Sequence, residues 1–394
     1  MAVKSIRDLE IGGRRVFFRF DFNVPLDETG TIKDDTRIQR ALPTLRYAME
    51  QGARCILSSH LGRPKGEKRP EMSLRPVALR LGDLLGREVR FADDCVGTKA
   101  EDASHALGDG ELLLLENLRF HPGETKNEPE FAQKLARLAD VYVNDAFGTA
   151  HRAHASTVGV PGLVSAKGAG LLLKEELDSL TKAFSNPEKP VTAIFGGAKV
   201  SDKLGVLTNI LERMDSVLIG GGMANTFLAA DGLDMGISRV EVDMLDTARD
   251  IVRSASEKGC SLYLPVDVVS APAMEHGAEC KTVAVEAVPT GEMALDIGRR
   301  TAAEFTGVIA RAGTIVWNGP MGVFELEDFK AGTMAIARAV ASAPGFSVVG
   351  GGDTVRAIHQ AGVTENISYI STGGGAFMEF MEGKTLPGVA ALEE

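Results

Sequence analysis

Short apolar runs recur along this sequence, and they constrain its fold more than any other feature. The clearer runs are RVFFRF (15–20), CILSS (55–59), LLLL (112–115), VYVN (141–144), VTAIF (191–195), SVLIG (216–220), LYLP (262–265), TIVW (314–317), FSVVG (346–350) and ISYI (367–370). Longer segments with helical periodicity separate them. Continuous apolar strands that alternate with helices predict parallel sheets covered by helices on both faces. These strands are too many for one small sheet, which favours two α/β domains.

The length of the chain supports this division. Its 394 residues exceed a single domain core, so two domains of roughly 150–200 residues each are expected. The segment 168–190 reads as a linker helix, which SNPEKP ends before the next strand. The sequence thus predicts two doubly wound, Rossmann-like domains, at 1–170 and 188–382, joined by a linker helix at 171–187 and a hinge.

Composition excludes several function classes. The net charge of −11 argues against nucleic acid or an anionic membrane as the main partner. The four cysteines form no C-x-x-C pair, which suits a reducing cytosol and favours neither a disulfide framework nor a structural zinc. The N-terminus does not resemble a secretory signal, and no apolar run reaches the ~20 residues of a membrane helix. We therefore expect a cytoplasmic protein.

Glycine clusters follow four strands of the second half. The stretches are IFGGAKVSDK (194–203), VLIGGGMANTF (217–227), VVGGGDTVRAI (348–358) and YISTGGGAFMEF (369–380). Glycine lets the backbone approach a ligand closely, and a helix N-terminus supplies free N–H donors. A single glycine turn often serves packing alone, but four together predict a nucleotide site. IFGGAKVSDK is not a P-loop, because Ala198 separates its lysine from the glycines.

Basic and polar side chains follow the strands of the first half. Arginine forks match phosphate and carboxylate oxygens in two-point contacts, so their recurrence at strand ends in an acidic protein predicts a small-anion site. One isolated arginine of this kind would more often be a solvated surface charge. The spacing of His151 and His154, with no acidic partner at ligand spacing, favours anion binding over zinc.

A nucleotide site in one domain and an anion site in the other predict a two-domain small-molecule kinase that closes to align its substrates and exclude water. A nicotinamide dehydrogenase would need G-x-G-x-x-G in a first βαβ unit, which the glycine turns do not match. A non-catalytic two-domain binding protein for a sugar phosphate would explain the basic half. It would not explain the four glycine turns.

Many of these stretches resemble one family. RFDFNVPLD, DDTRI, SSHLGRPKG, LLENLRFHPGE, NDAFGTAHRAHAS, FGGAKVSDK, LIGGGMANTF, WNGPMGVFE, GGGDT and STGGGAFMEFMEGKTLPGV are similar to the motifs of phosphoglycerate kinase, in family order from about residue 17 to the C-terminus. The resemblance implies reversible, Mg²⁺-dependent phosphoryl transfer between ATP and the carboxylate of 3-phosphoglycerate in glycolysis. It also implies a monomer whose C-terminal segment, 383–394, packs back on the N-terminal domain.

The resemblance further implies roles for single residues. The phosphoglycerate would be held by Asp21, Asn23, Arg37, His60, Arg63, Arg119 and Arg152. The nucleotide would be held by Gly196, Gly197, Lys199, Lys203, Gly220, Gly221, Leu295, Asn318, Pro320, Glu325, Gly351, Gly352, Asp353 and Thr354. Glu325 would bind the ribose, Leu295 would line the adenine pocket and Asp353 would carry the metal. Arg37, Lys199, Gly352 and Gly374 would act on the group in transit.

This assignment calls for no general base, because a carboxylate nucleophile is already ionised at pH 7. The protein must instead align the attack and neutralise the charge that spreads over the transferred group. Two stretches depart from the family pattern on the nucleotide side. They are Arg299 in DIGRR, where proline is expected, and FMEF (377–380), which replaces smaller residues.

Overall fold

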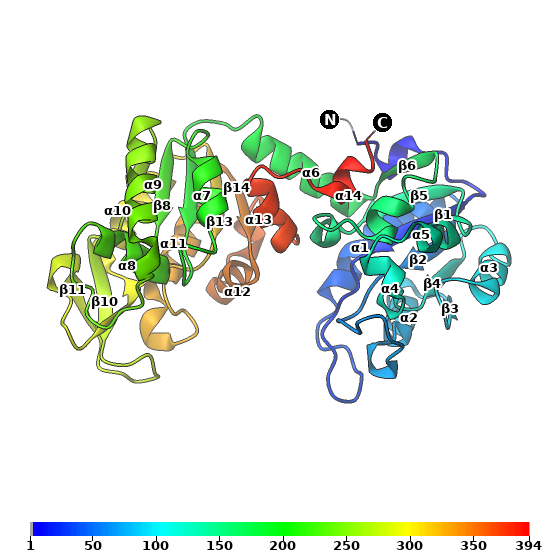
Figure 1. The fold of residues 1–394 in the computed structure, drawn as a ribbon, viewed down its shortest axis with the longest axis horizontal. Coiled ribbons are helices and arrows are strands. Elements are labelled where there is room, and N and C mark those ends of the chain that lie inside the picture. Colours follow the sequence, from blue (N-terminus) through cyan, green and yellow to red (C-terminus); the bar gives the residue numbers. More distant parts are fainter. Residues whose placement is uncertain (1–2, 394) are drawn as a thin grey trace. The chain divides into compact units, whose positions relative to one another are not determined.

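The structure, a computed structural model, describes residues 3–393 and divides into two compact units. One unit runs to Leu177 and includes the C-terminal segment from Thr385, and the other runs from Asp178 to Lys384. Each unit has its own parallel sheet of six strands, with helices packed against it (Figure 1). The predicted α/β class with two doubly wound sheets is therefore confirmed. Within residues 3–393, no helix is both long and apolar enough to span a membrane.

The sheet of the first unit has the strand order β3-β4-β2-β1-β5-β6, and all of its pairings are parallel. Its strands are β1 (Arg15–Phe20), β2 (Arg54–Ser58), β3 (Val89–Ala92), β4 (Leu112–Leu115), β5 (Val141–Asp145) and β6 (Ala166–Ala169). Its helices are α1 (Thr36–Glu50), α2 (Arg75–Leu85), α3 (Thr98–His105), α4 (Pro122–Thr125), α5 (Pro129–Ala136) and α14 (Pro387–Ala390). The central position of β1 places the residues that follow it in the middle of the sheet edge.

Both faces of this sheet are covered. On one face, Phe18 and Phe20 of β1 pack in a cluster with Leu45 of α1 and Leu81 of α2. On the other face, the ring of Phe17 stacks on Tyr142 of β5 with their centroids 6.2 Å apart. Side chains alternate between the faces of a strand, so a strand buried on both sides reads as a continuous apolar run.

The sheet of the second unit has the order β15-β14-β13-β7-β8-β9 and is also parallel. Its strands are β7 (Val191–Phe195), β8 (Ser216–Ile219), β9 (Ser261–Tyr263), β13 (Thr314–Asn318), β14 (Phe346–Gly350) and β15 (Tyr369–Ile370). Its helices are α7 (Leu204–Ile210), α8 (Gly221–Ala230), α9 (Leu245–Glu257), α10 (Arg299–Ile309), α11 (Ala331–Ser342), α12 (Gly352–Ala361) and α13 (Gly375–Met381). Trp317 of β13 is fully buried in the cluster that α10 and α11 form with this sheet.

A third, antiparallel sheet was not predicted. It has the order β11-β10-β12 and consists of β10 (Asp267–Ala271), β11 (Lys281–Ala284) and β12 (Met293–Ile297). β11 is exposed to partly buried, and Asp267 in β10 and Asp296 in β12 stand among the apolar residues of those strands, so none of the three shows a continuous apolar run. Leu228 of α8 packs against Val268 and Val285 of this sheet, which attaches it to the second unit.

Helix α6 (Leu171–Phe184) lies within the predicted linker, and the division between the units falls inside it, after Leu177. The C-terminal segment packs on the first unit. The backbone N–H of Gly388 donates to Ala150 O at 2.8 Å, and Leu392 is buried. The functional division into a phosphoglycerate domain (1–170 with 383–394) and a nucleotide domain (188–382) stays a prediction.

The packing of the C-terminal segment predicts a specific loss of stability. Leu392→Ala should lower the free energy of unfolding by about 2–4 kcal/mol, because Leu392 is 2% exposed and its truncation leaves a cavity. Leu79→Ala is the matched control, since Leu79 is 69% exposed. Urea unfolding followed by far-UV circular dichroism measures both variants. Equal midpoints for the two variants would contradict the packing.

Candidate functional site

The first candidate site forms around a buried arginine, Arg19, on the central strand β1. Its Nε donates to Ser156 Oγ at 2.8 Å, and its Nη1 donates to Phe20 O. Ser156 Oγ in turn donates to Glu124 Oε1 at 2.6 Å, and Ser156 N donates to Glu124 Oε2 at 3.0 Å. Arg19, Ser156 and Glu124 are all fully buried. Buried charges need such hydrogen-bonded partners, so this chain of contacts fixes the guanidinium in place.

A second arginine, Arg119, lies in the same electrostatic environment. It is 7% exposed, and its Nη1 donates to Gly62 O at 2.8 Å. Burial, together with the charges of Arg19 and Arg152, lowers its pKa to about 10. Its Nε is buried and has no hydrogen-bond partner among the described residues. An unpaired donor on a buried cation is costly, and an anionic ligand would satisfy it.

Two histidines of this site are held neutral. Burial lowers the pKa of His60 well below its usual value, and the charges of Arg19, Arg119 and Arg37 lower it further. Burial and the same buried arginines lower the pKa of His154 to about 4. His60 Nδ1 lies 3.2 Å from Arg19 Nη2 and therefore accepts its hydrogen bond. His60 thus accepts a hydrogen bond, and the positive charge of the site resides on the arginines.

The structure brings most of the predicted anion-site residues together. Asp21 forms an ion pair with Arg37, which lies in the first turn of α1. Asn23 Oδ1 accepts a hydrogen bond from Gly62 N at 2.8 Å. Arg63, which follows Gly62 in the sequence, is exposed. Arg152 is partly buried, and its charge contributes to the lowered pKa of Arg119.

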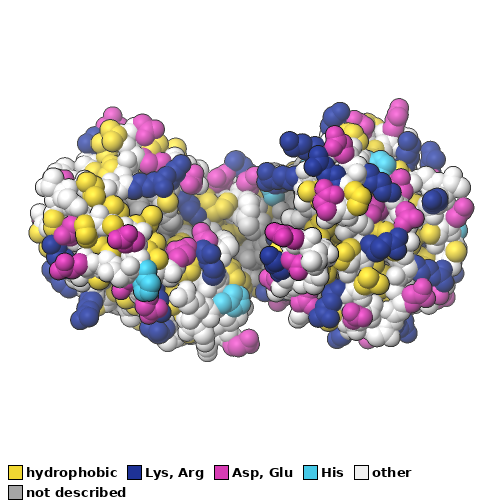
Figure 2. Space-filling model, turned by 90° about the horizontal axis from the view of Figure 1, so that it is seen from below, with side chains coloured by type: hydrophobic (Ala, Val, Ile, Leu, Met, Phe, Trp, Pro, Cys, Tyr) yellow, Lys and Arg dark blue, Asp and Glu magenta, His cyan; other side chains and the backbone are white. Residues whose placement is uncertain are grey.

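Arg19, Glu124 and Ser156 were missed by the sequence analysis. Arg19 had a visible signal, because it is the one charged residue inside the run VFFRF, which is otherwise apolar. Glu124 and Ser156 had none, because they are far from Arg19 in the sequence. On the face shown in Figure 2, basic and acidic side chains are interspersed over both units.

The second candidate site lies at the carboxyl edge of the other sheet. After β7, Gly196 N donates to Asn318 O at 3.1 Å and Gly197 N donates to Pro320 O at 3.0 Å. A Cβ added to Gly196 would lie 2.0 Å from Pro320 O, so only glycine fits there. Gly221, at the start of α8, has φ +66° and lies against Gly197. These contacts hold the turns after β7, β8 and β13 together.

The turn after β14 joins the same group. Asn318 Nδ2 donates to Gly350 O at 2.9 Å, and Gly319 N donates to Thr354 Oγ1 at 2.7 Å. Gly351 has φ +93° and precedes α12, whose first residue is Gly352. Added Cβ atoms at Gly197, Gly352 and Gly374 would meet no atom within 4 Å. The backbone at these three glycines is therefore open to a ligand.

Several charged side chains lie next to the glycine turns after β7 and β14. Arg356 Nη2 donates to Glu325 Oε1 and to Asp353 Oδ1, both at 2.8 Å. Burial lowers the pKa of Lys203 to about 8, against the opposing charges of Asp202 and Asp353. The segment between Lys199 and Lys203 is held by a residue that the sequence analysis missed, Glu241. Its carboxylate accepts from Val200 N at 2.5 Å and from Ser201 Oγ at 2.6 Å.

Two further residues of the predicted nucleotide site, Gly220 and Leu295, pack against neighbouring side chains. Gly220 lies beside the turn, where an added Cβ would meet Met321 Sδ at 2.5 Å. Leu295 is buried in a cluster with Ala271 and Phe329, so it belongs to the packing of β12 and its adenine-wall role stays a prediction.

The structure shows where the two stretches that depart from the family pattern lie. Arg299 is exposed at the start of α10. In the FMEF stretch, Phe377 is fully buried beneath Gly350, and Met378 Sδ lies 3.6 Å from Lys203 Nζ. The larger side chains therefore fill space next to the turns.

Comparison with known proteins identifies the family of this chain. The family profile of phosphoglycerate kinase matches residues 6–384. The chain belongs to the phosphoglycerate kinase family. It is 56% identical over 394 residues to phosphoglycerate kinase of Moorella thermoacetica, covering all of both chains, and 54% identical over 400 residues to that of Koribacter versatilis, covering 100% and 99%.

Solved structures of the family are similar over the whole chain. Phosphoglycerate kinase from Coxiella burnetii matches with a TM-score of 0.94 and 44% identity, covering 99% of each chain. The enzyme from Pyrococcus horikoshii matches with a TM-score of 0.84 and 36% identity, covering 98% of each chain. Membership of this family supports the enzymatic interpretation. Neither comparison favours the non-catalytic binding protein that the sequence left open.

The buried neutral histidine predicts a pH dependence of stability. The pKa of His154 falls from 6.5 to about 4 on folding, so the unfolded chain takes up the proton first as the pH falls. The stabilisation is complete above pH ~6.5 and is lost as the pH falls toward 4. It amounts to about 2 kcal/mol between pH 7 and pH 5.

Urea unfolding of wild type and His154→Gln at pH 7 and pH 5 measures this effect. Wild type should lose about 2 kcal/mol more than the variant over this range, because glutamine takes up no proton. Burial raises the pKa of Asp145 to about 6, so this group favours the folded state as the pH falls, opposite to His154. Because both proteins contain Asp145, its effect cancels when wild type is compared with the variant. Parallel pH profiles for the two proteins would show that His154 is not held neutral.

Proposed function

We propose that this chain is an ATP-dependent kinase that transfers a phosphoryl group reversibly between ATP and the carboxylate of 3-phosphoglycerate. The observation that carries the proposal is the buried arginine site of Arg19 and Arg119, in a chain whose whole length matches phosphoglycerate kinases. A small polyanion is the ligand class that suits this site. The glycine turns of the other unit suit the phosphates of a nucleotide.

In the first unit, Arg119 Nε would donate to the phosphate of 3-phosphoglycerate, because it is buried without a partner. Asn23, Arg63 and Arg152 would complete the contacts to this ligand. Arg19 is held by Ser156 and does not need to move when the ligand binds. Donors fixed before binding lose less conformational entropy, which favours affinity for the charged substrate.

In the second unit, the residues beside the glycine turns fit Mg²⁺. This ion prefers oxygen ligands and retains water, and proteins bind it through one or two carboxylates together with substrate phosphates. The Asp353 side chain is 68% exposed, and one of its oxygens is engaged by Arg356 at 2.8 Å. Asp353 would therefore hold the ion. When bound, Mg²⁺ would neutralise phosphate charge.

The transfer itself would depend on alignment and charge. Arg37 and Lys199 would neutralise the equatorial oxygens of the moving group, and backbone N–H groups at Gly352 and Gly374 would add donors. These residues belong to different units, so the proposal requires the domain closure that the sequence analysis predicted. The substrate carboxylate is already ionised and attacks directly. No protein side chain has to remove a proton.

We further propose that the protein is a cytoplasmic monomer with a glycolytic, ATP-forming role. The family relationship and the cysteine pattern support this interpretation. The role does not alter the chemistry of the site, because the enzyme accelerates both directions equally.

A coupled assay tests the function. ATP, Mg²⁺ and 3-phosphoglycerate are mixed with the protein, and a dehydrogenase that consumes the acyl phosphate reports product formation. We expect turnover that depends on all three additions. Tight binding of 3-phosphoglycerate by calorimetry with no turnover would identify a sugar-phosphate binding protein and reject the kinase.

The transition-state role of two cations predicts a kinetic signature. Arg37→Ala and Lys199→Ala should each lower kcat by about 10²–10³-fold while changing the Michaelis constants much less, because both side chains would act on the group in transit. Arg54→Ala and Lys189→Ala are matched controls, since each removes an ion pair with a partly exposed partner elsewhere. A raised Michaelis constant with unchanged kcat would reassign the residue to ground-state binding.

A further inference from the structure

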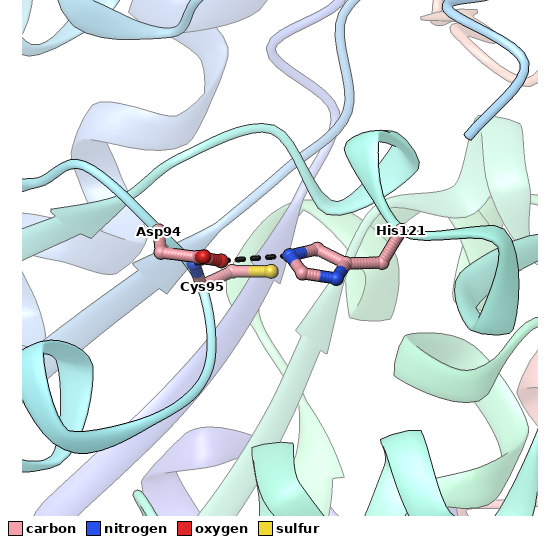
Figure 3. Close-up of side chains that lie close together, drawn as sticks. All are labelled: Asp94, Cys95 and His121. Atoms are coloured by element: carbon pink, nitrogen blue, oxygen red, sulfur yellow. Dashed lines mark hydrogen bonds and ion pairs between the residues drawn. The ribbon is translucent and has the colours of Figure 1, made fainter. Parts of the chain in front are cut away.

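A cluster of metal-ligand side chains lies outside the residues assigned to substrate and nucleotide. Asp94 and Cys95 belong to the loop that follows β3, and His121 immediately precedes α4. One carboxylate oxygen, the thiol sulfur and one ring nitrogen lie within 4.8 Å of one another. In Figure 3 the carboxylate and the thiol approach the same edge of the imidazole ring. Within residues 3–393 this is the only such group of His, Cys, Asp or Glu.

We propose that Asp94, Cys95 and His121 form a binding site for a borderline transition-metal ion of the Zn²⁺ class. Carboxylate oxygen, imidazole nitrogen and thiolate sulfur are the ligands that Zn²⁺ takes, at about 2.0–2.3 Å. Tetrahedral geometry at these lengths separates the ligand atoms by about 3.3–3.8 Å. The three ligand atoms lie within 4.8 Å of one another. His121 Nε2 and Asp94 Oδ1 are hydrogen-bonded at 2.7 Å, so they must move apart by about 0.6–1.1 Å to admit an ion.

The surroundings hold the ligands as a metal site requires. Cys95 N donates to Asp94 Oδ1 at 2.7 Å, which orients the carboxylate. The ring of Phe131 stacks on His121 with the centroids 5.1 Å apart, which fixes the plane of the imidazole. Such outer contacts usually orient the ligands of metal sites. These contacts are in place before any ion binds, so binding requires only that the ligand atoms separate and that the thiol and the imidazole nitrogen lose their protons.

Access to the cluster is asymmetric. The Asp94 and His121 side chains are 46% and 31% exposed, and Cys95 is fully buried. An ion can therefore enter from the carboxylate and imidazole side, and the sulfur forms the inner wall. Three protein ligands leave the fourth tetrahedral position to water.

Binding exchanges a proton for the ion. The buried Cys95 is a thiol, because burial and the charge of Asp94 raise its pKa well above the usual range. When the ion binds, the S–H bond breaks, an S–metal bond forms and one proton passes to solvent. His121 Nε2 donates to the Asp94 carboxylate in the ion-free site, so the proton on Nε2 must also leave when the ion binds there, and the bound imidazole carries a proton on Nδ1 only.

The donor set selects against the ion of the proposed reaction. Mg²⁺ requires oxygen ligands in octahedral geometry and binds thiolate and imidazole poorly. Millimolar Mg²⁺ should therefore not fill this site. The site is separate from the proposed phosphoryl transfer, and its test does not depend on that activity.

Equilibrium dialysis of the full chain against ZnCl₂, with excess MgCl₂ present, tests the proposal. The experiment uses a Cys280→Ser background, because Cys280 is an exposed thiol that could bind Zn²⁺ independently. We expect one equivalent of Zn²⁺ per chain. Co²⁺ should give the thiolate charge-transfer band and the intense visible bands of a tetrahedral site. Zn²⁺ should also raise the melting temperature, because it binds the folded state.

Cys95→Ser and His121→Gln should each weaken Zn²⁺ binding by at least ~10–100-fold, and Cys95→Ser should abolish the charge-transfer band. His276→Gln is the matched control, since His276 also lies near an aspartate, with Nδ1 3.4 Å from Asp328 Oδ2, but belongs to no such cluster. Cys260→Ser controls for removal of another buried thiol. Zn²⁺ affinity unchanged by Cys95→Ser or His121→Gln, or no Zn²⁺ bound, would overturn the proposal.

Discussion

The buried guanidinium of Arg19 is the constraint on which the first unit depends. A charge on the central strand of a sheet that is covered on both faces is removed from water, which costs several kcal/mol unless partners replace the solvent. Ser156 and Glu124 supply these partners from two other segments, the turn before β6 and helix α4. The charge therefore fixes the positions of three parts of the chain. Arg119 lies five residues before Glu124, and Arg152 lies four residues before Ser156, so a requirement of folding also places the proposed ligand contacts.

In the second unit, close contacts between backbone segments, rather than a buried charge, fix the turns at the edge of the sheet. Its turns approach one another so closely that side chains are excluded, as the space at Gly196 and the positive φ of Gly221 show. The hydrogen bonds of Asn318 and Thr354 then join the turns after β7, β13 and β14. The N–H groups of Gly196, Gly197 and Gly319 are used within the turns. The result is a surface where the backbone at Gly197, Gly352 and Gly374 has open space beside it. Such a surface suits phosphates, whose oxygens accept from several N–H groups at once.

Sequence reasoning was accurate where a single local signal sufficed. The central strands were predictable because burial on both faces makes them continuously apolar, and β1 and β7 were predicted with their observed bounds. The antiparallel strands β10 to β12 were missed because they are short and partly polar. The family motifs supplied the residues at strand ends. Glu124, Ser156 and Glu241 could not be predicted, because each acts through a partner far away in the sequence.

The same limit explains the Asp94, Cys95 and His121 cluster. Zinc sites are usually read from cysteines and histidines at short, regular spacing, and here 25 positions separate Cys95 from the histidine. Parallel strands remove that separation, because β3 and β4 are neighbours and their carboxyl ends meet at one edge of the sheet. A search by spacing excludes such sites even where the fold assembles them.

The net charge of −11 does not conflict with two anionic substrates. Exposed charges are screened over about 8 Å at physiological ionic strength, whereas buried charges are screened much less. The buried Arg19 and Arg119 therefore act strongly on the first site, where the buried Glu124 offsets part of their charge, although acidic residues outnumber basic ones over the whole chain. Burial is the main cause that lowers the pKa values of His60 and His154, and the charges of Arg19 and Arg119 lower them further. Where charges are buried matters more for ligand choice than how many the chain carries.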